Sequence, residues 1–309
     1  MARPRSRFRN FLEYAIARFA VATLRFTPRP LSEALGRRYV ALLDRGIPRL
    51  RQAGLGNLEQ ALPELTAEQR ARTIDGVFAS VGRTLVAFAK FPQIDRKTVN
   101  QWIRYEGIEH LDRAHARGKG VLFATAHLGN WELSAFAHAL LSRPMHVLVR
   151  PLDNPLLENY VERRRALSGN TIVAKKNFLR PVLQALARNE AVGILVDHNA
   201  LAEEGLFVNF FGIPACTSPA FAKLAAHSGA AVVPGYAFWS PVDQQYILRF
   251  HPELEITGDT ERDTQTVQRA VEDAVRAHPD QWLWIHRRWK TRPQPLAGRE
   301  TATSPVALS

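Results

Sequence analysis

The fold is decided by the stretch Ala124-Thr125-Ala126-His127-Leu128-Gly129-Asn130-Trp131-Glu132-Leu133, which joins a buried strand to a helix. An apolar run at 120–126 leads into the stretch, and helical spacing at 131–141 leads out of it. Gly129 and Asn130 supply the turn between them. His127 is therefore expected at the carboxyl end of a strand, the edge at which open α/β sheets bind their ligands.

His127 and Glu132 are five residues apart, so a helix alone would place them on different faces. A turn followed by the first turn of a helix can instead fold the carboxylate back against the imidazole. A carboxylate on one ring nitrogen fixes the tautomer and leaves the other nitrogen as a base. We therefore predict that His127 and Glu132 form a catalytic pair.

Strands and helices alternate from this stretch to about residue 278. The last two strands are separated by 241–243 and are expected to form a hairpin. Strands are predicted at 145–149, 171–174, 191–196, 231–239 and 245–250. The alternation predicts an α/β fold with a mostly parallel central sheet flanked by helices.

Two other predicted strands end in polar residues, Arg150 and Asp197. Parallel strands would bring both residues to the same edge as His127. Arg150 is a candidate contact for a developing oxyanion or a substrate phosphate. The backbone N–H groups of Gly129 and Asn130, at a helix start, are a second candidate anion site. All four are predicted to bind substrate.

Aromatic residues and histidines leave several alternatives open. Phe210 and Phe211 are predicted to line an apolar substrate cleft, with core packing as the alternative. The tryptophans and basic residues of 281–290 fit either an interfacial belt or a solvated basic face. His127, Asp197 and His198 could together hold a metal, but metal-specific spacing such as H-E-x-x-H is missing. No metal is therefore expected, and no cofactor is expected either.

Positive charge is concentrated at the N-terminus. The chain has 309 residues and a net charge of +12, and residues 1–51 carry twelve arginines against three acids. Such a basic end favours anionic lipid or nucleic acid as a partner. Phenylalanines recur at helical spacing over 8–26 beside arginines, which predicts an amphipathic helix lying in a membrane interface. The alternative is a helix docked on the protein's own core.

Changes in composition and the positions of helix-ending residues suggest how the chain is divided into segments. We expect an amphipathic membrane anchor at 1–30, a single domain at 31–290 and a disordered tail at 291–309. The domain is expected to combine a helical layer (31–100) with an α/β core (101–290). Cys216 is the only cysteine, which excludes a disulfide framework. The pattern shows no signal peptide and no apolar run of the roughly 20 residues that span a bilayer.

Several blocks of sequence together resemble the bacterial lipid A biosynthesis acyltransferases of the lauroyl/myristoyl type, within the lysophospholipid acyltransferase superfamily. The resemblance covers roughly residues 55–293. His127–Glu132 is similar to the family's H-x-x-x-x-D/E signature, and Arg150–Pro155 to its R-P-x-x-N-P block. The other similar blocks, in the same order, are Asp197–Asn199, Phe207–Gly212 with Thr217, Ala231–Pro234 and Gln281–Lys290.

The resemblance implies a glycerolipid acyltransferase-like α/β domain on the cytoplasmic face of the inner membrane. It implies transfer of a fatty acyl group from an acyl-carrier-protein thioester, or from acyl-CoA, to a hydroxyl of a lipid, without a metal or a covalent acyl-enzyme. His127 would be the general base and Glu132 its orienting partner. Arg150 would contact the substrate or the oxyanion, and Asp197 would belong to a binding or structural block.

The sequence departs from the family at its N-terminus, where Arg18 and Arg25 interrupt the apolar stretch. This departure favours a monotopic or peripheral anchor over a spanning helix. The expected partners are the acyl donor, a lipid acceptor and an anionic membrane surface. Nucleic acid is not expected, because the arginines lie beside phenylalanines and the body lacks a nucleic-acid motif.

The predicted function is O-acyl transfer to a lipid A precursor or a related glycolipid or lysophospholipid. One alternative keeps the chemistry and changes the acceptor, to a phosphatidylinositol mannoside or an aminolipid of the ornithine type. A less favoured alternative is a metal-dependent hydrolase that uses His127 and His198.

Overall fold

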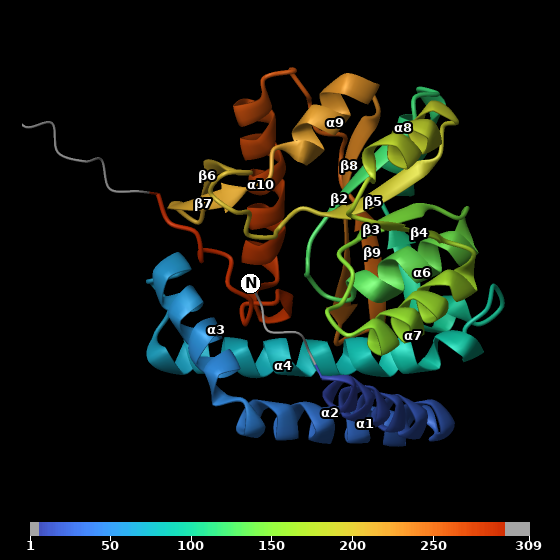
Figure 1. Ribbon diagram of the computed structural model, residues 1–309, viewed down its shortest axis with the longest axis vertical. Coiled ribbons are helices and arrows are strands. Elements are labelled where there is room, and N and C mark those ends of the chain that lie inside the picture. The colour runs from blue at the N-terminus through green and yellow to red at the C-terminus, as the bar shows by residue number, and fades with distance from the viewer. Residues whose placement is uncertain (1–5, 294–309) are drawn as a thin grey trace, which may run out of the picture.

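The computed structural model describes residues 6–293, and a seven-stranded sheet lies at its centre (Figure 1). The strands are β1 (Ile103–Glu106), β2 (Val121–Thr125), β3 (His146–Val149), β4 (Thr171–Ala174), β5 (Ala191–Leu195), β8 (Ala231–Ser240) and β9 (Gln245–Phe250). Their order in the sheet is β1-β9-β8-β2-β5-β3-β4. Neighbours run parallel except β8 and β9, which form the predicted hairpin. The predicted α/β class with a mostly parallel sheet is confirmed.

Helices cover both faces of the sheet and add a separate layer. The helices are α1 (Arg7–Phe26), α2 (Arg29–Gly46), α3 (Pro48–Ala61), α4 (Ala67–Lys90), α5 (Ile108–Ala116), α6 (Trp131–Leu141), α7 (Pro155–Arg165), α8 (Leu179–Ala187), α9 (Ala220–Ser228) and α10 (Thr260–Ala277). α5 and α6 pack on one face of the sheet, and α8, α9 and α10 pack on the other. α1, α2 and α4 lie along the bottom of Figure 1.

Short elements complete the fold. β6 (Leu206–Phe210) and β7 (Ile213–Thr217) form a separate antiparallel hairpin that packs on α10. Turns of 3₁₀-helix occur at Phe91–Gln93, Val99–Gln101, Ala166–Ser168 and Pro279–Gln281.

β2 occupies the middle of the sheet because both of its faces are apolar. Leu122 and Ala124 pack toward α8, α9 and α10, whereas Val121 and Phe123 pack toward α5 and α6. A continuous apolar run of this kind is typical of a parallel strand covered on both sides. β2 pairs with β8 on one side and β5 on the other, so His127 emerges at the centre of the sheet's carboxyl edge.

The turn after β2 depends on Gly129. Its φ is +62°, and a Cβ at this position would overlap the carbonyl oxygen of Ala237 on β8. Asn130 follows, donates its N–H to the Ala237 oxygen at 2.9 Å and accepts the N–H of Leu133 at 3.0 Å, so it caps α6. The turn therefore fixes both the position of His127 and the start of α6.

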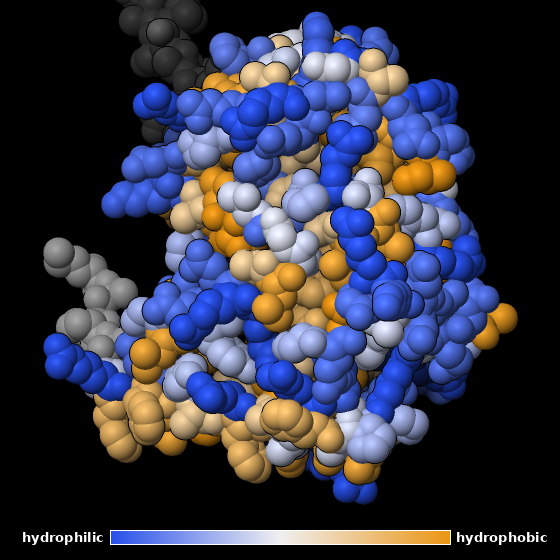
Figure 2. Space-filling view, turned by 90° about the vertical axis from the view of Figure 1, so that its right-hand side faces the viewer, coloured by the Kyte–Doolittle hydropathy of each residue, from blue (hydrophilic) through white to orange (hydrophobic). Residues whose placement is uncertain are grey.

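The first helix docks on the protein and still exposes an apolar face. Val21 and Leu24 are buried in a cluster with residues of α4, as the docking alternative expected. Phe8, Phe11, Ile16 and Phe19 are 60–75% exposed. Apolar side chains gather along the lower edge of the molecule in Figure 2, the edge along which α1 and α2 lie in Figure 1. Across residues 6–293, no helix is long and apolar enough to cross a bilayer.

Two further features of the structure differ from the sequence-based expectations: the first strand of the sheet and the burial of residues 281–290. β1 and α5 were not predicted, because β1 is a four-residue edge strand whose last three residues are only half-buried. Residues 281–290 form neither an interfacial belt nor a solvated face: Trp282, Trp284 and Arg288 are fully buried. The boundary at residue 30 stays a prediction, and residues 294–309 of the predicted disordered tail lie outside the described residues.

Replacing Gly129 by alanine tests the turn. We expect Gly129→Ala to lower the free energy of unfolding by about 3 kcal/mol, because a positive φ and a backbone overlap must both be accommodated. Thermal and urea unfolding measure this change. The matched control is Gly56→Ala within α3, where a Cβ meets nothing within 4 Å; it should stabilise the helix by about 0.5–1 kcal/mol. Equal stability of the two variants would contradict the assigned role of Gly129.

Candidate active site

His127 is held by Asp197 through two hydrogen bonds. The backbone N–H of His127 donates to Asp197 Oδ2 at 2.8 Å, and Nδ1 lies 3.0 Å from Asp197 Oδ1. Asp197 follows β5, the parallel neighbour of β2, so adjacent strand ends present the imidazole and the carboxylate to each other. Because Nδ1 bonds Asp197, Nε2 is the ring nitrogen that remains for a ligand, and 17% of the side chain is exposed.

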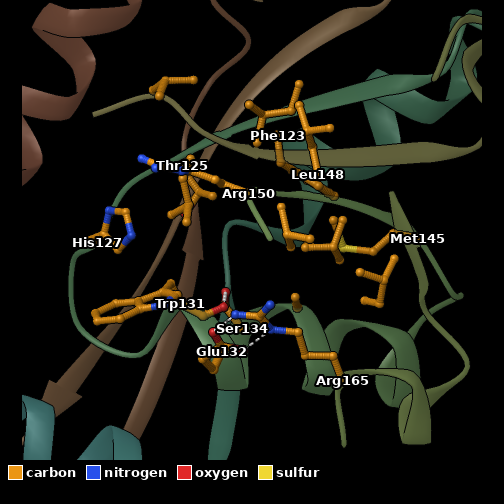
Figure 3. A pocket seen from close by; sticks show the side chains of 18 of the residues that line it. Phe123, Thr125, His127, Trp131, Glu132, Ser134, Met145, Leu148, Arg150 and Arg165 are labelled. Atoms are coloured by element: carbon orange, nitrogen blue, oxygen red, sulfur yellow. Dashed lines mark hydrogen bonds and ion pairs between the residues drawn. The ribbon is translucent and has the colours of Figure 1, made fainter. Parts of the chain in front are cut away.

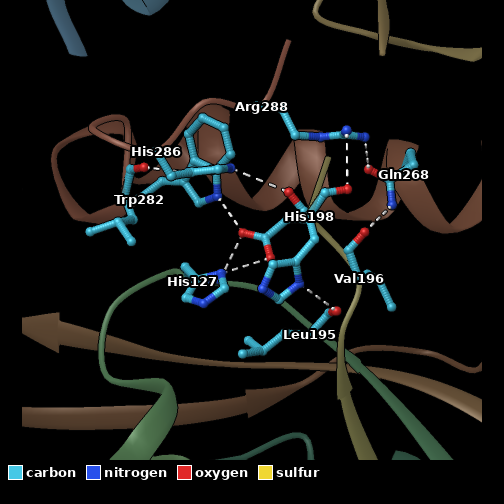
Figure 4. Close-up of polar contacts among 10 residues, drawn as sticks. His127, Leu195, Val196, His198, Gln268, Trp282, His286 and Arg288 are labelled. Carbon is cyan, nitrogen blue, oxygen red and sulfur yellow. Dashed lines mark hydrogen bonds and ion pairs between the residues drawn. The ribbon is translucent and has the colours of Figure 1, made fainter. Parts of the chain in front are cut away.

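Asp197 is fully buried and accepts a further hydrogen bond from the indole Nε1 of Trp282 at 2.9 Å (Figure 4). Trp282 belongs to a C-terminal strap, residues 281–291, that crosses the site. The N–H of Gly129 donates to Gln281 O and the N–H of Leu283 donates to His127 O, both at 2.9 Å. The strap therefore holds both the turn at His127 and the carboxylate of Asp197.

Arg288 supports the segment that carries Asp197. Its buried guanidinium donates to the carbonyl oxygens of His198 and Cys216 at 3.3 and 2.9 Å. It also donates to Gln268 Oε1 at 3.1 Å, and Gln268 Nε2 in turn donates to Val196 O at 2.8 Å. Burial lowers the pKa of Arg288 to about 10, which still leaves the group charged at neutral pH. These contacts hold the backbone on both sides of Asp197.

The environment of the pair sets its protonation. Burial alone would lower the pKa of His127, but the charge and hydrogen bond of Asp197 outweigh it and raise that pKa above its usual range. Burial alone would raise the pKa of Asp197, but the charge and hydrogen bond of His127 hold it well below its usual range. Burial lowers the pKa values of His198 and His286, the other two histidines nearby. His127 is thus the basic imidazole of the group.

The expected contact between Glu132 and His127 was wrong. Glu132 lies in the first turn of α6 and forms a two-pronged ion pair with Arg165 of α7, at 2.9 and 2.5 Å. The helix begins immediately after Asn130, so the Glu132 side chain projects toward α7 rather than back over the imidazole. Its negative charge still contributes to the raised pKa of His127. A catalytic role for Glu132 stays a prediction.

A cavity of about 610 Å³ opens beside His127, within the range of roughly 300–1,000 Å³ typical of small-molecule sites (Figure 3). It extends between α6 and the sheet, where Gly193 of β5 and Gly235 of β8 lack side chains. Apolar residues of its wall include Phe91, Phe123, Phe136, Met145, Val147, Leu148, Leu248 and Phe250. Glu132, Arg165 and Arg150 also line it, and Arg150 is exposed in the loop between β3 and α7.

Four predicted substrate-binding residues lie away from the cavity wall. The N–H groups of Gly129 and Asn130 are bonded to Gln281 O and Ala237 O, so the expected anion site at this turn was wrong. Phe210 and Phe211 do not line the cleft. They are buried in the core, where Phe210 packs 5.7 Å from Trp282 and Phe211 packs 5.5 Å from Trp284.

The histidine and aspartate groups also meet the spatial requirement for a metal site. Potential ligand atoms of His127, Asp197 and His198 lie within 4.8 Å of one another. The oxygens of Asp197, however, already accept three hydrogen bonds from His127 and Trp282, and His198 Nδ1 lies 3.2 Å from Leu195 O. Because both oxygens of Asp197 already bond protein donors, we interpret this group as a hydrogen-bonded His127–Asp197 dyad rather than a metal centre.

The sequence has relatives of known class. The sequence pattern described as bacterial lipid A biosynthesis acyltransferase matches residues 4–291. The chain therefore belongs to this family, and it is an acyltransferase.

Individual relatives cover nearly the whole chain. It is 30% identical to the lipid A biosynthesis palmitoleoyltransferase of Escherichia coli, over 86% of this chain and 87% of the relative. It is 26% identical to the lipid A biosynthesis acyltransferase of Haemophilus influenzae, over 89% and 86%. It is also 29% identical to the phosphatidylinositol mannoside acyltransferase of Mycobacterium tuberculosis, over 68% of each chain.

The pairing of His127 with Asp197 predicts the titration of the imidazole. In the wild type, the NMR titration of His127 should have its midpoint above 6.5, the ordinary pKa of histidine. Asp197→Asn removes the negative charge, so the midpoint should move to lower pH. His127→Gln identifies the resonance, and Glu190→Gln serves as a control because Glu190 contacts His146 instead. An unchanged midpoint in Asp197→Asn would refute the coupling.

Proposed function

We propose that the protein transfers a fatty acyl group from a thioester donor, acyl-carrier-protein or acyl-CoA, to a hydroxyl of a lipid A precursor or related glycolipid. The observation that carries this proposal is the His127–Asp197 dyad at the entrance of a largely apolar cavity. The dyad supplies a base, and the cavity offers room for an acyl chain. Membership of the lipid A acyltransferase family supports the choice of acceptor.

The proposed reaction needs one base and one anion-stabilising group. Nε2 of His127 takes the proton of the acceptor hydroxyl while its oxygen attacks the thioester carbonyl carbon. Asp197 balances the positive charge that develops on the imidazole. The tetrahedral intermediate then collapses, the carbon–sulfur bond breaks, and the leaving thiolate takes the proton from His127. No group outside donor, acceptor and protein is needed for this balance.

Arg150 is the proposed contact for negative charge. Its side chain is exposed at the cavity rim, where Lys175 adds a second positive charge. A guanidinium there suits either the developing oxyanion or a phosphate of the substrates. Both donor types carry phosphate groups beside the thioester arm, which fits a basic rim.

The second candidate acceptor is a phosphatidylinositol mannoside. The mycobacterial relative is named for that acceptor and aligns over two thirds of this chain. Both acceptors are glycolipids with hydroxyl groups, so the same dyad serves either. A product analysis with both acceptors distinguishes them.

We further propose that the protein works at the cytoplasmic face of the inner membrane as a monotopic or peripheral enzyme. The start of α1 contacts the loop that lines the cavity, because Asn154, which follows the lining residue Asp153, donates to Asn10 O at 2.9 Å. Leu152, on the cavity rim, and Leu156 are also exposed. An apolar surface flanked by arginines can rest on anionic lipid and bring the cavity to its acceptor.

Removing the imidazole tests the mechanism. His127→Ala should lower kcat by about 100- to 10,000-fold, the contribution typical of a general base. Mass spectrometry of the acylated lipid measures the rate, and circular dichroism verifies the fold. In the wild type, kcat/KM should rise with pH through a midpoint above 6.5, because only the neutral imidazole accepts a proton. His227→Ala, at an exposed position in α9, is the matched control. Near-normal turnover by His127→Ala would exclude the proposal.

Polar substitutions on α1 test the membrane contact. Replacing Phe8, Phe11, Ile16 and Phe19 by serine should reduce binding to phosphatidylglycerol vesicles by at least about tenfold, because exposed apolar area is what enters the interface. Sedimentation with vesicles measures the bound fraction. The control replaces Val242 and Leu201, which are 91% and 59% exposed on other elements, by serine. If the control weakens binding as much as the α1 variant, the assigned surface is incorrect.

A further inference from the structure

A second cavity, of about 170 Å³, lies between α2, α4 and the β8–β9 hairpin. It shares no lining residue with the catalytic cavity. Among the described residues that line it, Glu33 alone is acidic, so its wall carries a net charge of +2. A concave surface of this charge attracts an anion. The basic and aromatic residues of the wall are Arg29, Arg37, Arg83, Trp102, Trp239 and Tyr246.

The positions of Arg37 and Arg83 follow from the packing of α2 on α4. The two helices meet at Gly36 and Gly82, where a Cβ on Gly36 would lie 3.3 Å from the Gly82 carbonyl oxygen. Arg37 and Arg83 each come directly after one of these glycines, and both line the cavity. The close approach of the helices therefore brings two arginines to the wall of one cavity.

The charge of Arg29 is balanced within the protein. Its Nε donates to Glu33 Oε1 at 2.9 Å, and its terminal nitrogens donate to the carbonyl oxygens of Gln101 and Gln244 at 3.2 and 3.3 Å. The guanidinium also lies 4.4 Å from the centre of the Trp102 ring. Arg29 and Glu33 therefore neutralise each other, and the net charge of the wall belongs to Arg37 and Arg83.

Arg37 and Arg83 have no balancing acid. Neither forms an ion pair with any carboxylate of residues 6–293. The Arg83 guanidinium lies 5.3 Å from the centre of the Trp239 ring, which also lines the cavity. Tyr246 is neutral, because burial raises the pKa of its hydroxyl, so it does not compensate the arginine charge. Two cations at the wall of one cavity repel each other, and a bound anion would stabilise both.

We propose that this cavity binds a phosphate monoester through Arg37 and Arg83. Such a phosphate carries close to two negative charges at neutral pH, which matches the net charge of the wall. Guanidinium groups bind phosphate oxygens in a two-pronged geometry and stack on aromatic rings at the same time. A volume of about 170 Å³ is several times that of a water molecule, so it also has room for the group attached to the phosphate.

The phosphate can be carried by a lipid headgroup or by a soluble ester. Phe26 precedes Arg29 by three residues and is 75% exposed, and α1 and α2 lie along the same edge of the molecule (Figure 1). This edge is the one assigned above to the membrane. A headgroup and a soluble ester present the same chemical group to the two arginines, so binding experiments with both are needed.

Removing one charge from the cavity tests the site. Isothermal titration calorimetry of the full chain in detergent measures the binding of inorganic phosphate. Arg37→Gln should weaken this binding at least about tenfold, because a charged hydrogen-bond partner is lost. The matched control is Arg38→Gln, which removes the same charge from the next residue of α2, outside the cavity wall. Its affinity should stay within about twofold of the wild type. Equal losses in both variants, or no binding by the wild type, would overturn the proposal.

Filling the cavity tests its location without changing any charge. Ala79 of α4 lines the cavity, so Ala79→Leu occupies part of the space and leaves every arginine in place. Inorganic phosphate should bind at least about tenfold more weakly, because the leucine and the anion compete for the same volume. Circular dichroism and thermal unfolding verify that the variant is folded. An unchanged affinity in the folded variant would show that phosphate binds elsewhere and would refute the site.

Two further titrations identify the source of the phosphate. Phosphatidylcholine vesicles that contain phosphatidic acid present the monoester on a membrane, and glycerol 3-phosphate presents it in solution. If a lipid is the ligand, Arg37→Gln should bind these vesicles more weakly than Arg38→Gln does. If a soluble ester is the ligand, the two variants should differ with glycerol 3-phosphate alone. Either result supports the site, whereas equal binding by the two variants with both probes would contradict it. Acyl transfer is measured in neither titration, so the proposed function is tested separately.

Discussion

The hydrogen bond between His127 and Asp197 is the interaction on which the rest of the site depends. It exists because β2 and β5 are parallel neighbours and end at the same level, so two residues seventy positions apart meet at one edge. The carboxylate is fully buried and survives as an anion because the imidazole, a backbone N–H and an indole all donate to it. Gly129 and the C-terminal strap then determine where the imidazole points.

Much of the fold could be predicted from local patterns, whereas the partners in the site could not. Residue type and spacing are enough to predict the apolar strands β2 and β5 and the turn at Gly129. Whether Glu132 or Asp197 is the partner of His127 depends on which strands are neighbours in the sheet. The periodicity of apolar residues along the sequence does not reveal that order. The same limit explains why the N–H groups of the turn seemed available: their acceptors, Gln281 and Ala237, lie more than a hundred residues away.

Aromatic residues were the hardest to assign. The composition of a ligand cleft or a membrane belt is shared by Phe210, Phe211 and the tryptophans of the strap. In the structure these side chains instead pack together in the core, and Trp282 bonds Asp197. The apolar wall of the cavity is formed instead by residues scattered over six strands and α6, and these residues do not stand out as a motif. Gly193 and Gly235 leave room for the cavity because they lack side chains. Their effect can be recognised only once the order and register of the strands are known.

The C-terminal strap also has a consequence for the order in which the enzyme becomes competent. Translation makes α1 before residues 281–291, so α1 exists long before Trp282 reaches Asp197. Until the strap docks, the His127 carbonyl and the Gly129 N–H lack their partners, and the turn that carries His127 is not held in place. A nascent chain can therefore fold α1 before the turn that carries His127 is fixed, so the site is assembled only after residues 281–291 have been made.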